Sequence, residues 1–206
     1  MTAFSPRFSA PDAEILEREV AYHGFFSLVK LSLKHRLFGG GWSQPLTREI
    51  FERGDAVAVL PWDPIRDELI FVEQFRPGAL RDQDSPWMLE LVAGMVESGE
   101  EPIEVAARES LEEANTKPQD LLQICEYYNS PGISNERITL FCGRVDATQA
   151  GGIFGLDAEH EDIEVVVLSL ADALAKVASG EINNAMSIIA LQWLQLNQPM
   201  LEESWK

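Results

Sequence analysis

The chain has 206 residues, of which 46% are hydrophobic and 24% charged, and its formal net charge is −18 at pH 7. This length supports one domain with its own core, or one domain with a small addition. The negative charge argues against nucleic acid or a membrane surface as a partner. No apolar run reaches the roughly 18 residues of a membrane-spanning helix, and the two cysteines give no disulfide framework, so we expect a cytoplasmic protein.

The first part of the chain has the pattern of strands. Residues 1–14 are expected to be a loose leader, and apolar and polar residues then alternate from about residue 17 to residue 53. Three glycines at 39–41 interrupt the alternation, which resumes at 46–51. The pattern predicts a small antiparallel β subdomain at 1–54, too thin to be stable without packing on the rest of the chain or on a partner chain.

The remainder, residues 55–206, is expected to form the main domain, and its pattern mixes strands and helices. Strands are predicted at 56–60, 68–74, 87–92, 122–129, 139–145 and 163–168. Helices are predicted at 170–179 and 185–196. The last helix places five apolar residues at the spacing of a core-facing stripe: Met186, Ile189, Ala190, Trp193 and Leu194. These elements predict a mixed α/β fold.

A further helix is predicted at 102–114, and it carries an unusual group of carboxylates. At about 100° per residue, four apolar residues share the side expected to face the core: Ile103, Ala107, Leu111 and Ala114. Glu109, Glu112 and Glu113 lie together on the opposite side. Like charges three or four residues apart each cost roughly 0.2–0.5 kcal/mol. The cluster is either a solvated acidic face or a site for a hard divalent cation, which binds several oxygen ligands at once.

The spacing of these residues matches a known motif. Gly94 is followed at fixed spacings by five residues: Glu100, Arg108, Glu109, Glu112 and Glu113. This arrangement resembles the Nudix box, G-x5-E-x7-R-E-U-x-E-E-x-G-U, where U is apolar. The chain departs from the motif at Ser110, Asn115 and Thr116, none of which contributes a carboxylate. We expect the Ser110 hydroxyl to bond a backbone carbonyl and Asn115 to adopt left-handed geometry.

The flanking segments resemble bacterial ADP-ribose pyrophosphatases, a group of the Nudix hydrolases, from about residue 22 to residue 205. Matching stretches include T-R-E-I-F-E-R-G, V-E-Q-F-R, N-S-P-G-I-S-N-E-R and G-L-D-A-E-H-E-D-I. The resemblance implies a mixed sheet between helices, with the N-terminal antiparallel sheet swapped in a homodimer and contacting the substrate. It also implies hydrolysis of a nucleotide sugar, ADP-ribose, to AMP and ribose 5-phosphate, with two or three Mg²⁺ ions per active site and Mn²⁺ as the alternative ion.

The resemblance also implies roles for individual residues. Four groups would ligate the metal: Glu109, Glu113, Glu161 and the backbone carbonyl of Ala93. Glu112 would lie beside them as a further ligand or a neighbour of the ligands, and Arg108 would brace the carboxylates of the box. Glu159, in the loop at 147–162, would take the proton from the attacking water. Three glycines of this long loop, Gly151, Gly152 and Gly155, would act as hinges that let it close over the substrate.

Substrate contacts are implied for residues from both parts of the chain: Phe25, Phe26, Arg48, Glu49, Arg53, Arg76, Met95, Ser130, Pro131, Gly132 and Glu136. The two phenylalanines would hold the adenine, although at least one of two adjacent strand residues is expected to be structural. The arginines offer a bidentate fork that suits phosphate. The remaining residues would contact ribose or phosphate.

Two other functions fit the same sequence. A Nudix hydrolase of another nucleoside diphosphate sugar, such as GDP-mannose, or of a dinucleotide would share the metal chemistry and differ in its pocket walls. A non-catalytic ligand-sensing Nudix domain is of a different class. Such sensors tend to lose carboxylates of the box or to carry a DNA-binding unit, whereas this chain keeps every acidic position and shows no helix-turn-helix pattern.

Overall fold

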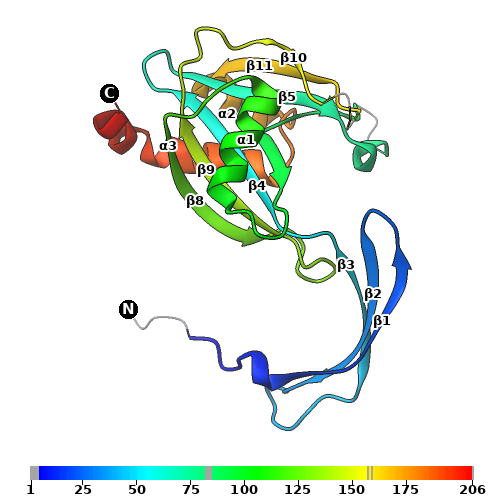
Figure 1. Ribbon diagram of the computed structural model, residues 1–206. Coiled ribbons are helices and arrows are strands. Elements are labelled where there is room, and N and C mark those ends of the chain that lie inside the picture. The colour runs from blue at the N-terminus through cyan, green and yellow to red at the C-terminus, as the bar shows by residue number, and fades with distance from the viewer. Residues whose placement is uncertain (1–4, 82–84, 157, 159, 206) are drawn as a thin grey trace. The chain divides into compact units, whose positions relative to one another are not determined.

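The computed structural model describes residues 5–81, 85–156, 158 and 160–205 (Figure 1). Contacts within the chain divide it into two units. The N-terminal unit consists of residues 1–54 and 128–136, and the main unit consists of residues 55–127 and 137–206. The sequence pattern did not indicate that the segment at 128–136 belongs with the first 54 residues. None of the helices that the structure describes has the length and apolar character of a membrane-spanning segment.

The N-terminal unit is built around a three-stranded antiparallel sheet in the order β1-β2-β3. Its strands are β1 (Ala13–His23), β2 (Ser27–His35) and β3 (Leu46–Glu52). The predicted small antiparallel sheet is therefore confirmed. The sequence interpretation was wrong at the start, because a short 3-10 helix at Ala10–Asp12 and then β1 begin within the expected leader. Every residue of β1 is exposed within this chain.

The main unit contains a mixed eight-stranded sheet whose main path runs β10-β11-β5-β4-β9-β8, with β6 beside β5 and β7 beside β4. Strand β4 runs parallel to β9 and antiparallel to β5 and β7. The strands are β4 (Ala56–Asp63), β5 (Glu68–Phe75), β6 (Trp87–Glu90), β7 (Val92–Met95), β8 (Asp120–Tyr128), β9 (Arg137–Arg144), β10 (Gly152–Phe154) and β11 (Ile163–Ser169). Strand β10 lies within the predicted loop and is too short to show periodicity.

Helices cover both faces of this sheet, with α1 (Pro102–Ala114) on one face and α2 (Leu170–Ser179) and α3 (Ala185–Trp205) on the other (Figure 1). Alternate residues of β5 show the two layers. Leu69 and Phe71 pack into a core with α2 and α3, whereas Ile70 and Val72 pack into a core with α1. Because side chains alternate across a strand, each strand supplies both cores. The predicted mixed sheet between helices is confirmed.

Helix α3 continues nine residues beyond its predicted end at residue 196 and passes through Pro199. The burial of Leu201 and the contact between the rings of Trp205 and Trp62, 6.1 Å apart, keep the last turns on the sheet. Arg144 also donates a hydrogen bond of 2.9 Å from Nη1 to the Trp205 carbonyl. Packing here outweighs the backbone donor that proline lacks.

Helix α1 has the predicted bounds, but the predicted orientation was wrong. Its buried side consists of Val105, Ala106, Ser110, Glu113 and Ala114, while three of the four residues expected to face the core are exposed: Ile103, Ala107 and Leu111. Apart from Glu113, the buried side presents small side chains, which let the helix approach the sheet closely. The helix therefore turns two of its carboxylates toward the protein instead of toward water.

Two of the departures from the motif, one within α1 and one at its C-terminal cap, behave as expected. The buried Ser110 hydroxyl donates a hydrogen bond of 2.8 Å to the carbonyl of Ala106. Asn115 ends the helix in the left-handed conformation, with φ 47° and ψ 35°, and its N–H donates to the carbonyl of Leu111. Both predictions are confirmed, so the departures preserve the helix that carries the carboxylates.

Candidate active site

Glu113 lies at the centre of the carboxylate cluster, on the buried side of α1. Its side chain faces β7, and its Oε2 atom accepts a hydrogen bond of 2.9 Å from the backbone N–H of Ala93. Glu113 is 3% exposed. An ionised carboxylate at such a depth is costly unless hydrogen bonds or cations stabilise it. The structure thus brings together two of the predicted metal-binding residues, Ala93 and Glu113.

Glu109 lies one turn earlier and packs directly over Gly94 of β7. A Cβ atom added at Gly94 would lie 1.9 Å from Oε1 of Glu109 and 2.2 Å from its Cδ atom. Gly94 has no positive φ, so a turn does not require glycine here. Its role is to leave room for the carboxylate, a reason that the spacing of the motif alone does not give.

Burial shifts the titration of both glutamates. It raises the pKa of Glu109 to about 7, an effect that the Arg108 charge opposes and the charges of Glu112 and Glu161 reinforce. Burial likewise raises the pKa of Glu113 to about 8, although the N–H of Ala93 opposes this rise. Both carboxylates are therefore poorly stabilised as anions by the protein alone.

Arg108 is the cation in closest contact with the box. Its Nη1 atom lies 2.9 Å from Oε1 of Glu109 and 2.9 Å from Oε2 of Glu112, and its Nη2 atom lies 3.8 Å from Oε1 of Glu100. One guanidinium thus faces three carboxylates and leaves the group with a net negative charge.

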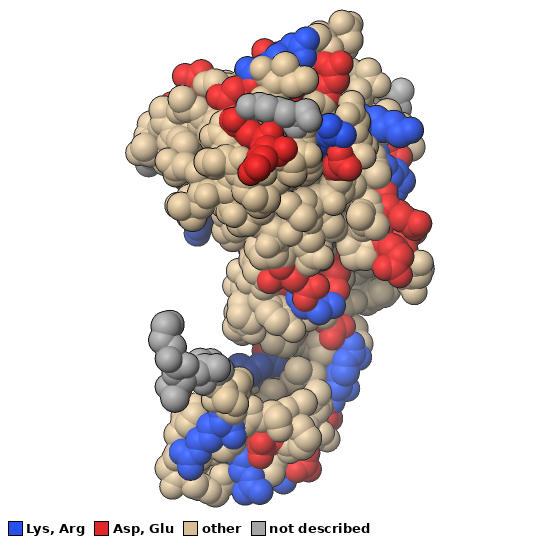
Figure 2. Space-filling model, turned by 90° about the vertical axis from the view of Figure 1, so that its left-hand side faces the viewer, with Lys and Arg blue, Asp and Glu red and all other residues tan. Residues whose placement is uncertain are grey.

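On the face drawn in Figure 2, acidic side chains form several separate groups with Lys and Arg among them.

Glu161 approaches the same cluster from the segment before β11. Its charge contributes to the raised pKa of both Glu109 and Glu113. Its Oε2 atom accepts a hydrogen bond of 3.1 Å from the N–H of Leu156, and its own N–H donates to the Leu156 carbonyl at 3.3 Å. These two bonds fix the position of Glu161. The predicted base, Glu159, lies outside the described residues.

Gly155 permits this arrangement. Its φ of +109° is rare for residues with a side chain, and an added Cβ would lie 2.6 Å from the Cβ of Glu161 and 3.2 Å from its backbone carbonyl carbon. The sequence interpretation assigned this glycine to a hinge of the loop. In the structure it allows close contact with the residue that carries a predicted metal ligand.

The donor set fits a hard divalent cation. Carboxylates and a backbone carbonyl are oxygen ligands of the kind that Mg²⁺ binds, and the raised pKa values of Glu109 and Glu113 indicate carboxylates that a cation would stabilise. Within the described part of the chain, no three acidic, histidine or cysteine side chains already converge as a finished metal site.

Arg76 and Met95 also belong to the main unit. Arg76 follows β5, and its Nε atom donates a hydrogen bond of 2.6 Å to Oε2 of Glu90 on β6. Its charge is among those that lower the pKa of Glu113, so its guanidinium lies near the cluster. Met95 ends β7 and is half-buried. The sequence interpretation missed Glu90, whose only signal is a carboxylate within an otherwise apolar stretch, W-M-L-E-L-V.

The predicted aromatic contacts lie together in the N-terminal unit. The Phe26 ring packs edge-on against Phe25 and Phe51, with ring centroids 4.6 Å and 5.2 Å away, and the Arg53 guanidinium lies 5.3 Å from the Phe26 centroid. Phe25 is 86% exposed. The Phe26 ring therefore packs against its neighbours, whereas the ring of Phe25 is exposed to solvent.

Glu136 lies beside these aromatic residues and is buried. It forms an ion pair of 3.0 Å with Nη1 of Arg53 and accepts a hydrogen bond of 3.0 Å from Nδ2 of Asn129. The loop between these two residues contains the predicted contacts Ser130, Pro131 and Gly132, all exposed. Its Ser130 carbonyl accepts hydrogen bonds from the N–H groups of Ile133 and Ser134, at 3.0 and 2.9 Å, which close a tight turn.

Arg48 and Glu49 are exposed neighbours on β3. Arg48 donates a hydrogen bond from Nη1 to the Thr47 carbonyl, at 2.8 Å, and Glu49 lies in register with Lys30 of β2. The predicted substrate contacts are therefore divided between the units. The N-terminal unit carries the aromatic group and its arginines, and the main unit carries the carboxylates and Arg76.

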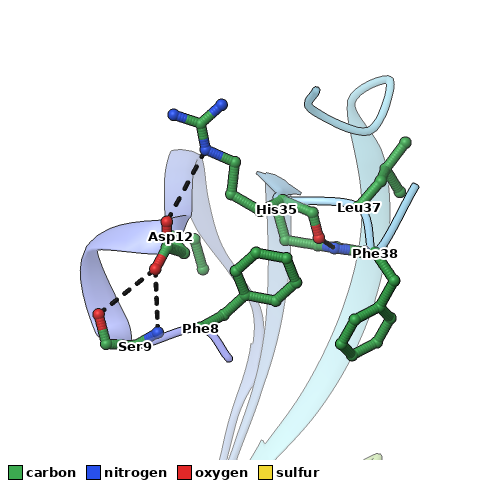
Figure 3. A pocket seen from close by; sticks show the side chains of 8 residues that line it. Phe8, Ser9, Asp12, His35, Leu37 and Phe38 are labelled. Carbon is green, nitrogen blue, oxygen red and sulfur yellow. Dashed lines mark hydrogen bonds and ion pairs between the residues drawn. The ribbon is translucent and has the colours of Figure 1, made fainter. Parts of the chain in front are cut away.

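A cavity of about 320 Å³ lies elsewhere in the N-terminal unit (Figure 3). It is lined by Phe8, Ser9, Asp12, Ala13, His35, Arg36, Leu37 and Phe38. Asp12 accepts a hydrogen bond of 3.0 Å from the N–H of Ser9 and lies 3.8 Å from Nε of Arg36. None of the predicted site residues lines this cavity, so it is separate from the candidate active site.

Comparisons with known proteins place this geometry in context. The NUDIX domain family matches residues 52–200. The chain is 48% identical over 198 residues to the ADP-ribose pyrophosphatase of Escherichia coli (strain K12), covering 96% of this chain and 95% of that protein. It is 32% identical over 154 residues to the GDP-mannose pyrophosphatase of Cronobacter sakazakii, covering 72% and 78%. A crystal structure of an ADP compounds hydrolase shares the fold, with a TM-score of 0.69 and 20% identity over 96% of this chain and 98% of that one.

Proposed function

The chain belongs to the NUDIX domain family, and on this premise we propose that it is a hydrolase that cleaves the pyrophosphate of ADP-ribose to AMP and ribose 5-phosphate. The observation that carries the proposal is the 48% identity to ADP-ribose pyrophosphatases over 96% of the chain. The carboxylate cluster supports it, because the cluster supplies the oxygen ligands that metal-dependent hydrolysis requires.

Glu109, Glu113, Glu161 and the carbonyl of Ala93 would hold the metal, with Glu112 beside them. A bound Mg²⁺, or Mn²⁺ in its place, supplies charge neutralisation at the pyrophosphate and lowers the pKa of a bound water; we propose two or three ions per site. Hydrogen bonds hold two of these carboxylates in place. The backbone N–H of Ala93 donates to Glu113 at 2.9 Å, and the backbone N–H of Leu156 donates to Glu161 at 3.1 Å. Arg108 braces Glu109 and Glu112 from the other side, at 2.9 Å from each.

Proton transfer and substrate binding fall to other residues. Glu159 would accept the proton of the attacking water at its carboxylate, as a base that is not consumed in holding metal. The exposed ring of Phe25 would stack on the adenine, since a flat aromatic face suits any base. Phe26, against which Phe25 packs, would complete the adenine contact. Contacts with ribose or phosphate are proposed for Arg48, Glu49, Arg53, Arg76, Met95, Ser130, Pro131, Gly132 and Glu136.

Product analysis tests this function. Purified protein treated with a chelator is expected to leave ADP-ribose intact, and added Mg²⁺ is expected to restore release of AMP and ribose 5-phosphate in equal amounts, resolved by ion-exchange chromatography. Release of adenosine or free phosphate would instead indicate cleavage at another bond.

We propose a cytoplasmic setting, which agrees with the free thiols of Cys125 and Cys142. Burial raises the pKa of the Cys142 thiol to about 12 and makes it unreactive.

A second substrate class has a specific observation in its favour. The 32% identity to a GDP-mannose pyrophosphatase covers 72% of the chain, so a different nucleoside diphosphate sugar is the alternative. The match covers less of the chain at lower identity than the match to ADP-ribose pyrophosphatases. The presence of every carboxylate of the box disfavours a non-catalytic sensor.

Replacing Gly94 with Ala is expected to weaken metal binding while the fold survives. The new Cβ would overlap the Glu109 carboxylate, the flexible end of a side chain, which can move away at small cost. The Mg²⁺ concentration for half-maximal turnover should rise about 10–100-fold, the range seen when the surroundings of metal ligands are altered. Gly39→Ala is the matched control, because no atom lies within 4 Å of its added Cβ. Equal Mg²⁺ dependence in both variants would refute the role given to Gly94.

The protein is expected to be a homodimer that exchanges its N-terminal sheet. Strand β1 exposes Ile15, Val20 and Tyr22 within a single chain, and exposed apolar side chains in such number mark an interaction surface. Sedimentation velocity should show a dimer, and Ile15→Lys/Val20→Lys should shift it toward monomer. Glu19→Lys, a change at an already polar position of the same strand, should leave the dimer intact. A wild-type monomer with full activity would contradict the exchange.

A further inference from the structure

Glu90 is a buried carboxylate outside the proposed set of metal ligands, and it lies on the same side of the sheet as α1. On β6 it stands in register with Val72 of β5. Residues directly opposite each other in an antiparallel pair project to the same face, and Val72 belongs to the core beneath α1. The Glu90 side chain therefore projects toward the layer that contains the carboxylate cluster.

The one ion pair that Glu90 forms within the described part of the chain is with Arg76. The side chain of Glu90 is 8% exposed and that of Arg76 is 40% exposed, with 2.6 Å between Nε and Oε2. A carboxylate at this depth requires such a partner. The contact engages the Nε edge of the guanidinium. No described residue forms a hydrogen bond with Nη1 or Nη2 of Arg76, so the two groups that make a bidentate fork are available to a ligand.

The surroundings fix this pair in place near the cluster. The amide of Asn184, just before α3, donates a hydrogen bond of 2.8 Å to the carbonyl of Leu89 and accepts one of 3.1 Å from the N–H of Ser187. Strand β6 is thus held by β5 on one side and by the start of α3. Glu90 lies three residues before Ala93, whose N–H donates to Glu113 at 2.9 Å, so the pair lies close along the chain to the strand that contacts the proposed metal site.

A second buried polar group lies next to the pair. Gln74 stands in register with Met88, two residues from Glu90 on the same face of the strand pair. It is 7% exposed, and its Nε2 atom has no hydrogen-bond partner among the described residues. Polar groups are rarely buried in this way without a partner or a ligand. This corner of the sheet is therefore more polar than packing alone would require.

We propose that Glu90 is a positioning residue, which holds Arg76 by its Nε edge so that the Nη groups bind a phosphate of the nucleoside diphosphate sugar. The inference rests on the proposed function. Glu90 itself does not touch the substrate: its negative charge and its fixed place on β6 set the direction of the guanidinium. A purely structural ion pair would make the same contact but would have no effect on substrate affinity in a folded variant.

The test compares steady-state kinetics of Glu90→Gln, Arg76→Lys and the double variant on ADP-ribose at saturating Mg²⁺. Loss of the charge that orients Arg76 should raise KM by about tenfold, with a smaller change in kcat. Arg76→Lys keeps a cation beside Glu90 but lacks the fork, and should raise KM to a similar extent. In the double variant the Glu90 change should add less than about twofold, because its effect passes through Arg76.

Two further variants separate positioning from folding. Glu73→Gln removes the same charge from the neighbouring strand, in register with Leu89 on the opposite face, and should leave KM unchanged. Glu90→Asp keeps the charge and should restore part of the affinity; it also carries the test if Glu90→Gln does not fold. Unchanged KM in a folded Glu90→Gln variant, or full additivity with Arg76→Lys, would overturn the proposal. Absence of ADP-ribose hydrolysis by the wild type would instead overturn the proposed function, and this inference with it.

Discussion

Glu113→Gln is expected to lower turnover of ADP-ribose on the order of 10²–10³-fold, because a metal ligand supplies several kcal/mol of transition-state stabilisation. The variant should still fold. Gln keeps an oxygen that accepts the hydrogen bond now given by Ala93 at 2.9 Å, and it removes a negative charge from a buried position. Glu109→Gln is expected to lose turnover in the same way. Initial rates at saturating Mg²⁺ and ADP-ribose measure both effects.

The same variant should alter the stability of the metal-free protein in a pH-dependent manner. Burial raises the pKa of Glu113 from 4.5 to about 8. The stability that the protonated group contributes is thus present below about pH 4.5 and is lost as the pH rises through about 8. Gln cannot ionise, so the melting temperature of Glu113→Gln should exceed that of wild type by more at about pH 8 than at about pH 5.

Glu104→Gln is the control for both measurements, since Glu104 is exposed in the first turn of the same helix. It should retain wild-type turnover and show no such pH-dependent gain. Full activity in folded Glu109→Gln or Glu113→Gln would show that α1 does not supply the metal ligands. A Glu113→Gln variant that unfolds would show that the carboxylate is needed for the fold rather than for metal.

Glu159→Gln is expected to reduce kcat by about 10²–10⁴-fold, the usual contribution of a general base. Affinity for Mg²⁺ and for ADP-ribose should stay near wild type, since this carboxylate is proposed to act on water alone. Calorimetric titration with Mg²⁺ and single-turnover rates separate binding from chemistry. The prediction rests on the position of Glu159 two residues before Glu161, whose charge reaches Glu109 and Glu113.

The matched control is Glu164→Gln, which removes the charge of an exposed residue of β11 and should leave kcat unchanged. Wild-type turnover by Glu159→Gln would assign the proton to another group. Loss of Mg²⁺ affinity together with turnover would instead make Glu159 a ligand. The two variants together therefore define which carboxylates of this segment take part in the chemistry.

The sequence predicted the elements that carry the site better than their orientation. The bounds of α1 follow from Pro102 at its start and Asn115 at its end, both local signals. The buried face of α1 does not follow, because apolar residues occur on both sides and the choice depends on fit against β7. Only the structure reveals that Gly94 gives the Glu109 carboxylate its place.

Long-range pairing limits what a sequence can reveal about Glu90 and the end of α3. The contact between Arg76 and Glu90 spans fourteen residues of the chain and depends on the register of β5 and β6. A helix that continues through Pro199 contradicts a local rule, and it does so because Leu201 is buried against the sheet. The carboxylates of α1 that are proposed to bind metal could be singled out from the sequence, because their spacing within one helix is itself the signal.

The most direct test of the account is the ratio of kcat/KM for ADP-ribose to kcat/KM for GDP-mannose, measured with Mg²⁺ under identical conditions. A dinucleotide such as a diadenosine polyphosphate completes the comparison. We predict that ADP-ribose is preferred by at least about 100-fold, a difference of about 2.7 kcal/mol in transition-state binding. Equal values, or a preference for GDP-mannose, would retain the carboxylate chemistry of α1 but contradict the assigned substrate and its contacts.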